Sequence, residues 1–299
     1  MLNNVPRRYL VISLFIVCWT LIYKIYVTPS HSRFSFTANE KNQNTKQYEI
    51  STWRELFQLK AGLALSSQSI AEYYKVDGFH LNKEQWNTLA CTLAKPAGII
   101  SGSSVIDFGC GVGAFLYEIS TRCGVKSNIH VFGIDFAPTM IQIADQWLTP
   151  SVDRDAGIQH FWIADITNAS IVPSNSFTHA VSHSVFQYLQ TYQNAFDALS
   201  EMARVVRENG TIALLDLNDA AKRSEALKSY RRDKNRSAHL SNSPTLDHLF
   251  IPKNLIKQWA DRLGLKIILI LDESTLPLQF YNRSPFRFCV YMKKSTPLR

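Results

Sequence analysis

VIDFGCGVG, residues 105–113, is the most informative stretch of this chain. An apolar run that ends in Asp107 leads into three glycines at alternate positions, Gly109, Gly111 and Gly113. Glycines at this spacing let the backbone turn sharply and approach a ligand closely, while a following helix presents its N-terminal amides. The stretch therefore predicts a strand, a ligand-binding turn and a helix, in that order.

Short apolar runs alternate with longer amphipathic segments from about residue 80 onward. This alternation is typical of strand–helix–strand units, which build a parallel sheet. We therefore expect an α/β fold with a Rossmann-like, seven-stranded, mostly parallel sheet and helices on both faces. The expected strands span residues 104–108, 129–134, 158–164, 177–183, 211–217, 265–271 and 286–292.

Acidic residues close the first three expected strands. Asp107 ends the first strand, Asp135 follows the second and Asp165 follows the third. Because the carboxyl ends of parallel strands meet at one edge of a sheet, these carboxylates should surround a single crevice. Asp135 stands 22 residues after Gly113, where a carboxylate can hold both hydroxyls of a ribose. Asp135 and Asp165 also have a purely structural interpretation, as caps of the segments that follow them.

This arrangement resembles the class I S-adenosylmethionine-dependent methyltransferase family, over roughly residues 70–293. In that family the first strand ends in Asp-x-Gly-x-Gly-x-Gly. The resemblance implies that S-adenosylmethionine is the cofactor. It further implies that Asp107 meets the cofactor's amino group, Asp135 its ribose and Asp165 its adenine. The other cofactor contacts implied in this way are Gly109, Gly111, Gly113, Phe136, Met140, Ile166 and Ser182.

An oxidoreductase is the alternative that the glycines alone leave open. A nicotinamide-binding loop would place its third glycine one residue later, where this chain has Ala114. The aspartate before the loop matches the methyltransferase pattern instead. One position departs from that pattern, because Thr178 follows Phe177 where the family commonly has an aspartate.

Residues 182–189, SHSVFQYL, follow the fourth expected strand, and the resemblance places them between cofactor and acceptor. His183 is the first candidate base, because a neutral imidazole suits proton abstraction near pH 7. Tyr188 is a candidate orienting hydroxyl. His239 and His248 are further candidate bases in a region whose geometry the sequence does not reveal. A buried, merely hydrogen-bonded histidine is the structural alternative for His183.

The segment 218–253 is an insertion after the fifth expected strand, where the family places its acceptor-binding lid. Tyr230, Arg231 and Arg232 lie in its basic run and predict contact with an anionic acceptor or lipid surface. A solvated loop is the structural alternative.

Charge distribution disfavours a nucleic-acid partner. The net charge of +8 is concentrated in residues 1–50 and 218–240, and the remainder is neutral. A nucleic-acid binder usually spreads its positive charge over a domain face. Family branches that methylate nucleic acids or protein amides also carry an Asn/Asp-Pro-Pro-aromatic motif, and residues 182–185 read SHSV instead. We expect a small-molecule or lipid-like acceptor. RNA or protein methylation and a catalytically silent cofactor-binding module remain alternatives.

The cysteines suggest neither a metal site nor a disulfide framework. Their number is odd and their spacing irregular, with no CxxC pair and no Cys/His cluster, so we expect single buried thiols for most of them and no metal. They are Cys18, Cys91, Cys110, Cys123 and Cys289.

Residues 9–27 predict a single membrane-spanning signal-anchor helix, and hence a membrane protein. They contain one charge, Lys24, and as a helix span about 28 Å, close to the hydrocarbon thickness of a bilayer. Arg7 and Arg8 favour a cytoplasmic N-terminus, but Lys24 and Arg33 dilute this bias, so the side facing the domain stays open. The expected organisation is a tail at 1–8, an anchor at 9–27, a flexible tether at 28–50 and a methyltransferase domain at 51–299.

Overall fold

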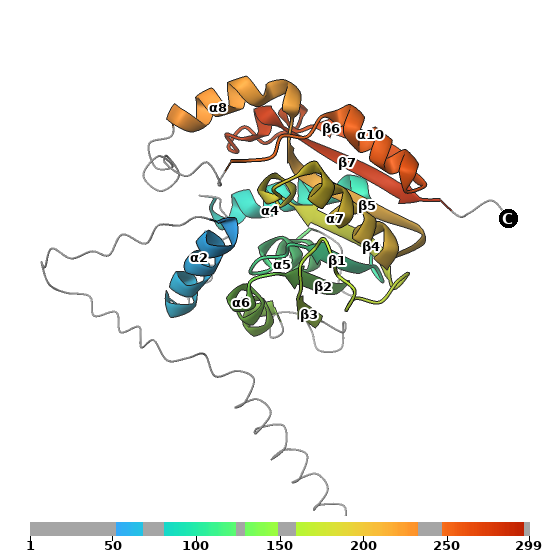
Figure 1. The fold of residues 1–299 in the computed structure, drawn as a ribbon. Helices are drawn as coiled ribbons and strands as arrows, with labels where there is room; N and C mark the ends of the chain where they lie inside the picture. Colours follow the sequence, from blue (N-terminus) through green and yellow to red (C-terminus); the bar gives the residue numbers. More distant parts are fainter. Residues whose placement is uncertain (1–51, 68–80, 124–128, 149–159, 233–246, 296–299) are drawn as a thin grey trace, which may run out of the picture. The chain divides into compact units, whose positions relative to one another are not determined.

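The computed structural model describes residues 52–67, 81–123, 129–148, 160–232 and 247–295. Seven strands form one sheet in the order β3-β2-β1-β4-β5-β7-β6 (Figure 1). The strands are β1 (Ser104–Phe108), β2 (His130–Asp135), β3 (His160–Ile163), β4 (Phe177–His183), β5 (Val206–Asn218), β6 (Leu265–Asp272) and β7 (Arg287–Lys294). The first five strands pair in parallel, and β7 runs antiparallel to both of its neighbours. The Rossmann-like, mostly parallel seven-stranded sheet is confirmed.

Helices cover both faces of this sheet, as predicted (Figure 1). The α-helices are α2 (Trp53–Ser67), α4 (Lys83–Ala94), α5 (Ala114–Thr121), α6 (Pro138–Leu148), α7 (Tyr192–Val205), α8 (Arg223–Arg232) and α10 (Lys253–Arg262). Apolar residues recur along α4, α5 and α6 at helical spacing, and these helices bury them against one face. Helices α7 and α10 do the same on the other face.

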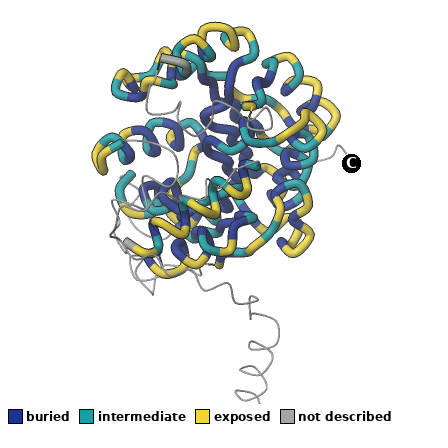
Figure 2. Tube along the Cα trace, turned by 60° about the vertical axis from the view of Figure 1, so that its left-hand side comes forward, coloured by how far each residue is buried: buried dark blue, intermediate teal, exposed yellow. Residues whose placement is uncertain are grey.

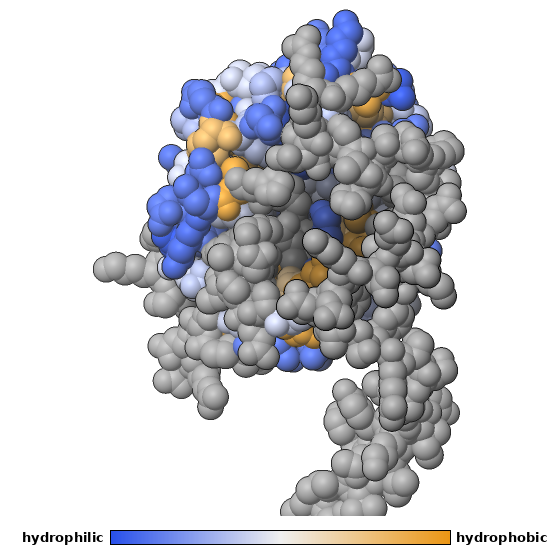
Figure 3. All heavy atoms as spheres, turned by 90° about the vertical axis from the view of Figure 1, so that its left-hand side faces the viewer, coloured by the Kyte–Doolittle hydropathy of each residue, from blue (hydrophilic) through white to orange (hydrophobic). Residues whose placement is uncertain are grey.

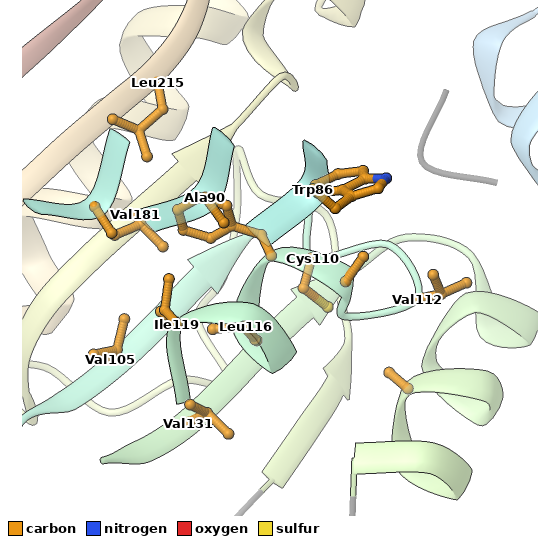
Figure 4. Close-up of a cluster of buried hydrophobic side chains, with 14 of the residues drawn as sticks. Trp86, Ala90, Val105, Cys110, Val112, Leu116, Ile119, Val131, Val181 and Leu215 are labelled. Carbon is orange, nitrogen blue, oxygen red and sulfur yellow. The ribbon is translucent and has the colours of Figure 1, made fainter. Parts of the chain in front are cut away.

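The two faces carry separate cores because successive strand residues point to opposite sides. On the first face, Trp86 of α4 and Leu116 of α5 pack with Val105, Val181 and Leu215 of the strands (Figure 4). Alternate strand residues enter the second core, beneath α7 and α10. The buried residues run through the middle of the trace, and exposed residues lie on the outer turns (Figure 2).

The strand order also fixes where a ligand can bind. The chain moves outward from β1 to β2 and β3, then returns to place β4 on the other side of β1. In open sheets of this kind, ligands bind outside the carboxyl ends of the strands, at the point where the order reverses. In this protein that point lies beyond the ends of β1 and β4.

Strand β5 differs most from its predicted range of 211–217. It extends from Val206 to Asn218 and contains irregularities against both neighbouring strands. Residues 208–210 lie within it, with Asn209 in the left-handed region at φ 60°. A local sequence pattern marks where a strand is apolar, but the added residues at its start extend a strand whose first residue, Val206, pairs with Phe177 of β4, far away in sequence.

The predicted anchor at 9–27 and tether at 28–50 lie outside the described residues. None of the helices within the described ranges is long and apolar enough to cross a membrane.

A disulfide joins Cys91 of α4 to Cys123, just after α5. Single buried thiols were the expectation for most cysteines, and this is wrong for these two; it is confirmed for Cys110 and Cys289. Helices α4 and α5 pack against each other, which brings the two Cα atoms to 5.1 Å. That distance suits a disulfide, and a sequence separation of 32 residues gives no sign of it.

Gly133 of β2 provides a test of the first core. A methyl group added there would lie 2.6 Å from Cys110 Sγ and 2.9 Å from a ring carbon of Phe161. We expect Gly133→Ala to lower the free energy of unfolding by about 1–3 kcal/mol, because both neighbours are buried and fixed. Urea unfolding followed by circular dichroism measures this. Gly62→Ala in α2, which meets nothing within 4 Å, is the control and should leave stability equal or higher. Equal effects of both variants would contradict the packing described here.

Candidate functional site

A cavity of about 360 Å³ opens at the carboxyl ends of β1, β2 and β4. Its size lies in the range of small-molecule and cofactor sites. On the side where α2 lies, hydrophobic surface is visible inside a hollow (Figure 3). The lining residues are Thr52, Trp53, Arg54, Phe57, Asp107, Gly109, Cys110, Gly111, Phe115, Asp135, Phe136, Met140, Asp165, Ile166, Thr167, His183, Ser184, Val185, Tyr188, Leu189, Gln190 and Asn194.

The glycine turn forms the floor of this cavity at the end of β1. The amides of Gly109 and Cys110 both donate to Ile134 O, at 2.8 and 2.9 Å, which ties the turn to β2. Gly109 has φ 82°, and a Cβ there would lie 2.6 Å from Val185 Cγ2. A residue with a side chain at this position would therefore strain the backbone and displace the wall of the cavity.

Gly113 has a different place from the other two glycines. It is the N-cap residue of α5, with φ 81°, and it does not line the cavity. Its Cα faces Leu148, so that an added side chain would press on α6. Its predicted contact with a cofactor stays a prediction, and its observed role is the turn into α5.

Asp135 is buried between the turn and the start of α6. Its Oδ2 accepts a hydrogen bond from Gly111 N at 3.0 Å, and its Oδ1 accepts one from Ala137 N at 2.8 Å. Burial raises its pKa to about 6, against the opposing effect of these amide hydrogen bonds. The carboxylate therefore braces the loop, as in the structural interpretation. It also lines the cavity, and each oxygen retains a lone pair for a ligand hydroxyl.

Asp165 and Phe136 mark the far end of the cavity, where Met140 and Ile166 also line the wall. Asp165 Oδ1 accepts from both the backbone and the hydroxyl of Thr167, at 2.9 and 2.8 Å. Its other oxygen lies 4.0 Å from Arg54 Nη2. The same guanidinium lies 4.7 Å from the centre of the Phe136 ring. Asp165 thus caps a local turn and still presents a carboxylate oxygen to the cavity side.

Ser182 is turned away from the cavity. Its hydroxyl donates to Phe108 O at 2.8 Å, and the residue is almost fully buried. The structure therefore places it as a brace between β4 and β1, and it does not line the cavity. Asp107, the acidic residue of β1, is buried and does line the cavity.

His183 and Tyr188 both line the cavity. The imidazole of His183 stacks on Phe115 at 4.9 Å and meets Trp86 edge-on at 5.9 Å. Burial lowers its pKa to about 4, and Asp216 opposes this shift. His183 is consequently a neutral imidazole at pH 7.

Tyr188 belongs to an aromatic cluster that the sequence does not reveal. Its ring centre lies 4.7 Å from that of Trp53, 5.0 Å from that of Phe57 and 5.5 Å from that of His248. Trp53 and Phe57, with Arg54, come from α2, which follows the predicted tether. The one signal for this helix in the sequence is the spacing of its first apolar residues, Trp53 and Phe57, which stand four apart.

Of the predicted acceptor residues, Tyr230 lies apart from the cavity lining. Its hydroxyl lies 3.3 Å from Asn218 Oδ1 and accepts from Arg287 Nη2 at 3.1 Å. Residues 220–232 of the segment 218–253 form a short 3-10 helix and α8, not the solvated loop that was the structural alternative, and contact of the segment with an acceptor stays a prediction. The side chains of Arg231 and Arg232, and His239, lie outside what the structure describes.

A metal site was not expected. Within the described ranges, no group of three or more His, Cys, Asp or Glu side chains is placed to hold a metal ion.

Comparison with known proteins places this geometry in context. Residues 99–263 match the family model described as a methyltransferase domain. A demethylmenaquinone methyltransferase from Shouchella clausii (strain KSM-K16) is 24% identical over 155 residues, which are 50% of this chain and 60% of that protein. One from Tropheryma whipplei (strain Twist) is 30% identical over 140 residues, which are 46% of this chain and 50% of that protein. The chain thus spans about half of the length of the curated relatives it matches.

Solved structures share the fold at low identity. A chain from the complex of the Haloferax volcanii Trm112 methyltransferase activator with a methyltransferase is 18% identical, with a TM-score of 0.53 over 80% of this chain and 98% of that one. The [4+2]-cyclase SpnF is 14% identical, with a TM-score of 0.50 over 70% of this chain and 81% of that one. Likenesses at this level show the fold alone, and function must be argued from the site.

Asp135 gives a direct test of the cofactor side. We expect Asp135→Ala to weaken binding of S-adenosylmethionine by roughly 10-fold or more, because hydrogen bonds to a buried carboxylate are lost. In the unchanged protein, affinity should fall as the pH drops through about 6, where the carboxylate takes up a proton. The variant should lack this pH dependence. Isothermal titration calorimetry measures both effects. Asp145→Ala, an exposed change on α6, is the control, and affinities that match across all three proteins would refute the assignment.

Proposed function

Because this chain belongs to the methyltransferase domain family, whose class I members use S-adenosylmethionine, we propose that it transfers a methyl group to a small, lipid-like acceptor. S-adenosylmethionine is its cofactor. One observation carries the proposal: the cavity has an acidic end and an aromatic end, and His183 lines it as a neutral imidazole.

The acidic end fits the cofactor. Carboxylates from Asp107, Asp135 and Asp165 line it, and Gly109 and Gly111 expose backbone to it. Donor and acceptor groups of an amino acid and a ribose find complementary partners there. Phe136, Met140 and Ile166 supply apolar surface at the same end for a planar base. When bound, the cofactor supplies an electrophilic methyl group.

The aromatic end suits an apolar acceptor. Trp53, Phe57, Val185, Tyr188 and Leu189 line it, and the acidic residues of the described lining are Asp107, Asp135 and Asp165, which we assign to the cofactor. Burying an ammonium group against rings and aliphatic chains without a carboxylate is costly. We therefore favour a hydroxyl or carbon nucleophile on an apolar molecule over an amine. The demethylmenaquinone methyltransferases among the relatives support an acceptor of this kind.

His183 and Tyr188 provide the chemistry that an acceptor of this type requires. A neutral imidazole accepts a proton, whereas an imidazolium would repel the positively charged donor. The rings of Phe115 and Trp86 hold His183 in one orientation. Tyr188, packed between Trp53 and Phe57, presents a hydroxyl that can orient the acceptor. Positioning of this kind accounts for a large part of the rate enhancement of such displacements.

The membrane anchor is part of the proposal. A lipid-like acceptor is available at a bilayer surface, and residues 9–27 suit a span followed by a tether that leads to the domain. The Cys91–Cys123 disulfide supports a location of the domain in an oxidising compartment, because disulfides rarely persist in the cytosol. Arg7 and Arg8 before the span favour a cytoplasmic N-terminus, which would put the domain on the opposite side of the membrane.

Methyl transfer is tested with the full-length protein in detergent, labelled S-adenosylmethionine and a lipid-plus-metabolite extract. We expect an apolar product to gain the label. His183→Asn should lower the rate of transfer roughly 100-fold or more while cofactor binding stays unchanged, because general bases contribute factors of this size. Label in RNA or protein, or binding without transfer to any component, would contradict the proposal. An unchanged rate of transfer in His183→Asn would show that His183 is not the general base.

Compartment and tether are tested together. We expect peptide mapping without reductant to recover Cys91 linked to Cys123 from protein isolated with its membranes, since the pair is joined in the fold. The domain should resist added protease in sealed vesicles of native orientation and remain with the membrane in alkaline carbonate. Free thiols at both positions, or release into the soluble fraction, would contradict this location.

A further inference from the structure

Asp216 lies in a bulge of β5 that changes the face to which its side chain points. Leu214 pairs with Val290 and Leu217 pairs with Phe288, so two residues of β5 stand opposite one residue of β7. Both leucines belong to the second core, whereas Leu215 belongs to the first. The extra residue therefore places Leu215 and Asp216 together on the first face of the sheet.

His183 lies on the same face of the sheet and at nearly the same position along the strands as Asp216. It pairs with Leu215 across the parallel β4–β5 ladder, and the next amide of β4, Ser184 N, donates to Leu215 O at 3.0 Å. Asp216 is thus one residue from the strand partner of the candidate base. Without the bulge, its side chain would alternate to the face covered by α7 and α10.

The conformation of Asp216 is unusual for a buried strand residue. Its φ is 58°, in the left-handed region, and its side chain is fully buried. Such conformations persist where the surrounding structure imposes them, and they cluster at functional sites. They are also tolerated best by Asp, Asn and Gly, which makes Asp216→Asn a conservative change of the backbone.

A cation and a phenol hold the Asp216 carboxylate on one side. Oδ1 accepts from Tyr281 Oη at 2.8 Å and lies 3.5 Å from Arg287 Nε. Arg287 also donates to Asp216 O at 3.3 Å and to Tyr230 Oη at 3.1 Å. Oδ2 of Asp216 is buried and has no hydrogen-bond donor among the described residues.

Charges on two strands of the described sheet act on His183 in opposite directions, and Asp107 of β1, the other neighbour of β4, lines the same cavity. Asp216 of β5 favours its protonated form, and Arg287 of β7 opposes protonation. The helices packed against His183 present uncharged rings, Trp86 from α4 and Phe115 from α5. Burial is the main cause of the low pKa of His183, and the carboxylate and the guanidinium adjust that pKa in opposite directions.

We propose that Asp216 is a positioning residue that the β5 bulge brings to His183, where its carboxylate stabilises the imidazolium formed when the acceptor loses its proton. This inference rests on the proposed function. The acceptor's proton moves to His183, and the electron pair it leaves forms the bond to the methyl carbon. The electron pair of the broken carbon–sulfur bond stays on sulfur, so no further reactant is required. Arg287 and Tyr281 fix the carboxylate in place.

Asp216→Asn tests this through a signature that a structural role would not produce. Removing the negative charge lowers the pKa of His183, which makes it a weaker base. We expect kcat to fall roughly 10-fold or more, and the acidic limb of the kcat–pH profile to move to lower pH. KM and the affinity for the cofactor should stay unchanged. Arg287→Gln removes the opposing charge and should move the acidic limb to higher pH.

Glu273→Gln is the matched control. Glu273 is fully buried in the same first-face cluster, where its Oε1 accepts from Cys289 Sγ at 3.1 Å, but it is not among the groups that act on His183. The acidic limb should be the same as in the unchanged protein. Equal losses of kcat in Asp216→Asn and Glu273→Gln, with no shift of the limb, would overturn the proposal and leave a structural cluster.

A second measurement needs no acceptor and separates this inference from the proposed function. In protein with ¹³C-labelled histidine, His183 is assigned from the signal that is missing in His183→Asn. Its titration midpoint, about 4 in the unchanged protein, should move to lower pH in Asp216→Asn and stay constant in Glu273→Gln. This shift without methyl transfer to any acceptor would keep the Asp216–His183 interaction and refute the function. Methyl transfer with an unshifted midpoint would support the proposed function and refute the Asp216–His183 interaction.

Discussion

The loop after β1 can bind a ligand because one buried carboxylate holds it in place. Asp135 accepts hydrogen bonds from Gly111 N and Ala137 N, so a single side chain fixes both the glycine turn and the start of α6. Ile134 O fixes the same turn from β2 through two further amides. The conformational entropy that the glycines lose and the cost of burying a charge are offset by these bonds. A ligand then meets a glycine turn and a carboxylate that are already oriented.

Much of this arrangement could be predicted because it depends on local pattern. Apolar runs of strand length, the glycine spacing and the aspartate after each run are all readable along the chain, and Asp107, Asp135 and Asp165 do line one cavity. The features that could not be predicted depend on contacts distant in sequence. Arg54 reaches Phe136 only because α2 packs near α6, and the β5 bulge appears only in its register with β7.

The surroundings of His183 show that the sheet can bring together residues that lie far apart in the sequence. Asp216 and Arg287 are 71 residues apart and meet as a fully buried pair. Such pairs are a poor source of stability, since the desolvation of two charges offsets their attraction. Burial and the charge of Asp216 raise the pKa of neighbouring Glu273 well above its usual value. The Asp216 carboxylate and the Arg287 guanidinium both act on the nearby His183, which lines the cavity.

We propose that a sulfonium nucleoside lies across the ends of β1, β2 and β3, between the glycine turn and the wall formed by α2. A crystal structure of the protein with S-adenosylhomocysteine, the product form of the cofactor, tests it most directly. We expect the ribose hydroxyls to lie within hydrogen-bond distance of Asp135, and the adenine ring to lie between Phe136 and Ile166. Density for the nucleoside elsewhere, or side chains that fill the space above Gly109 and Gly111 in its presence, would contradict it.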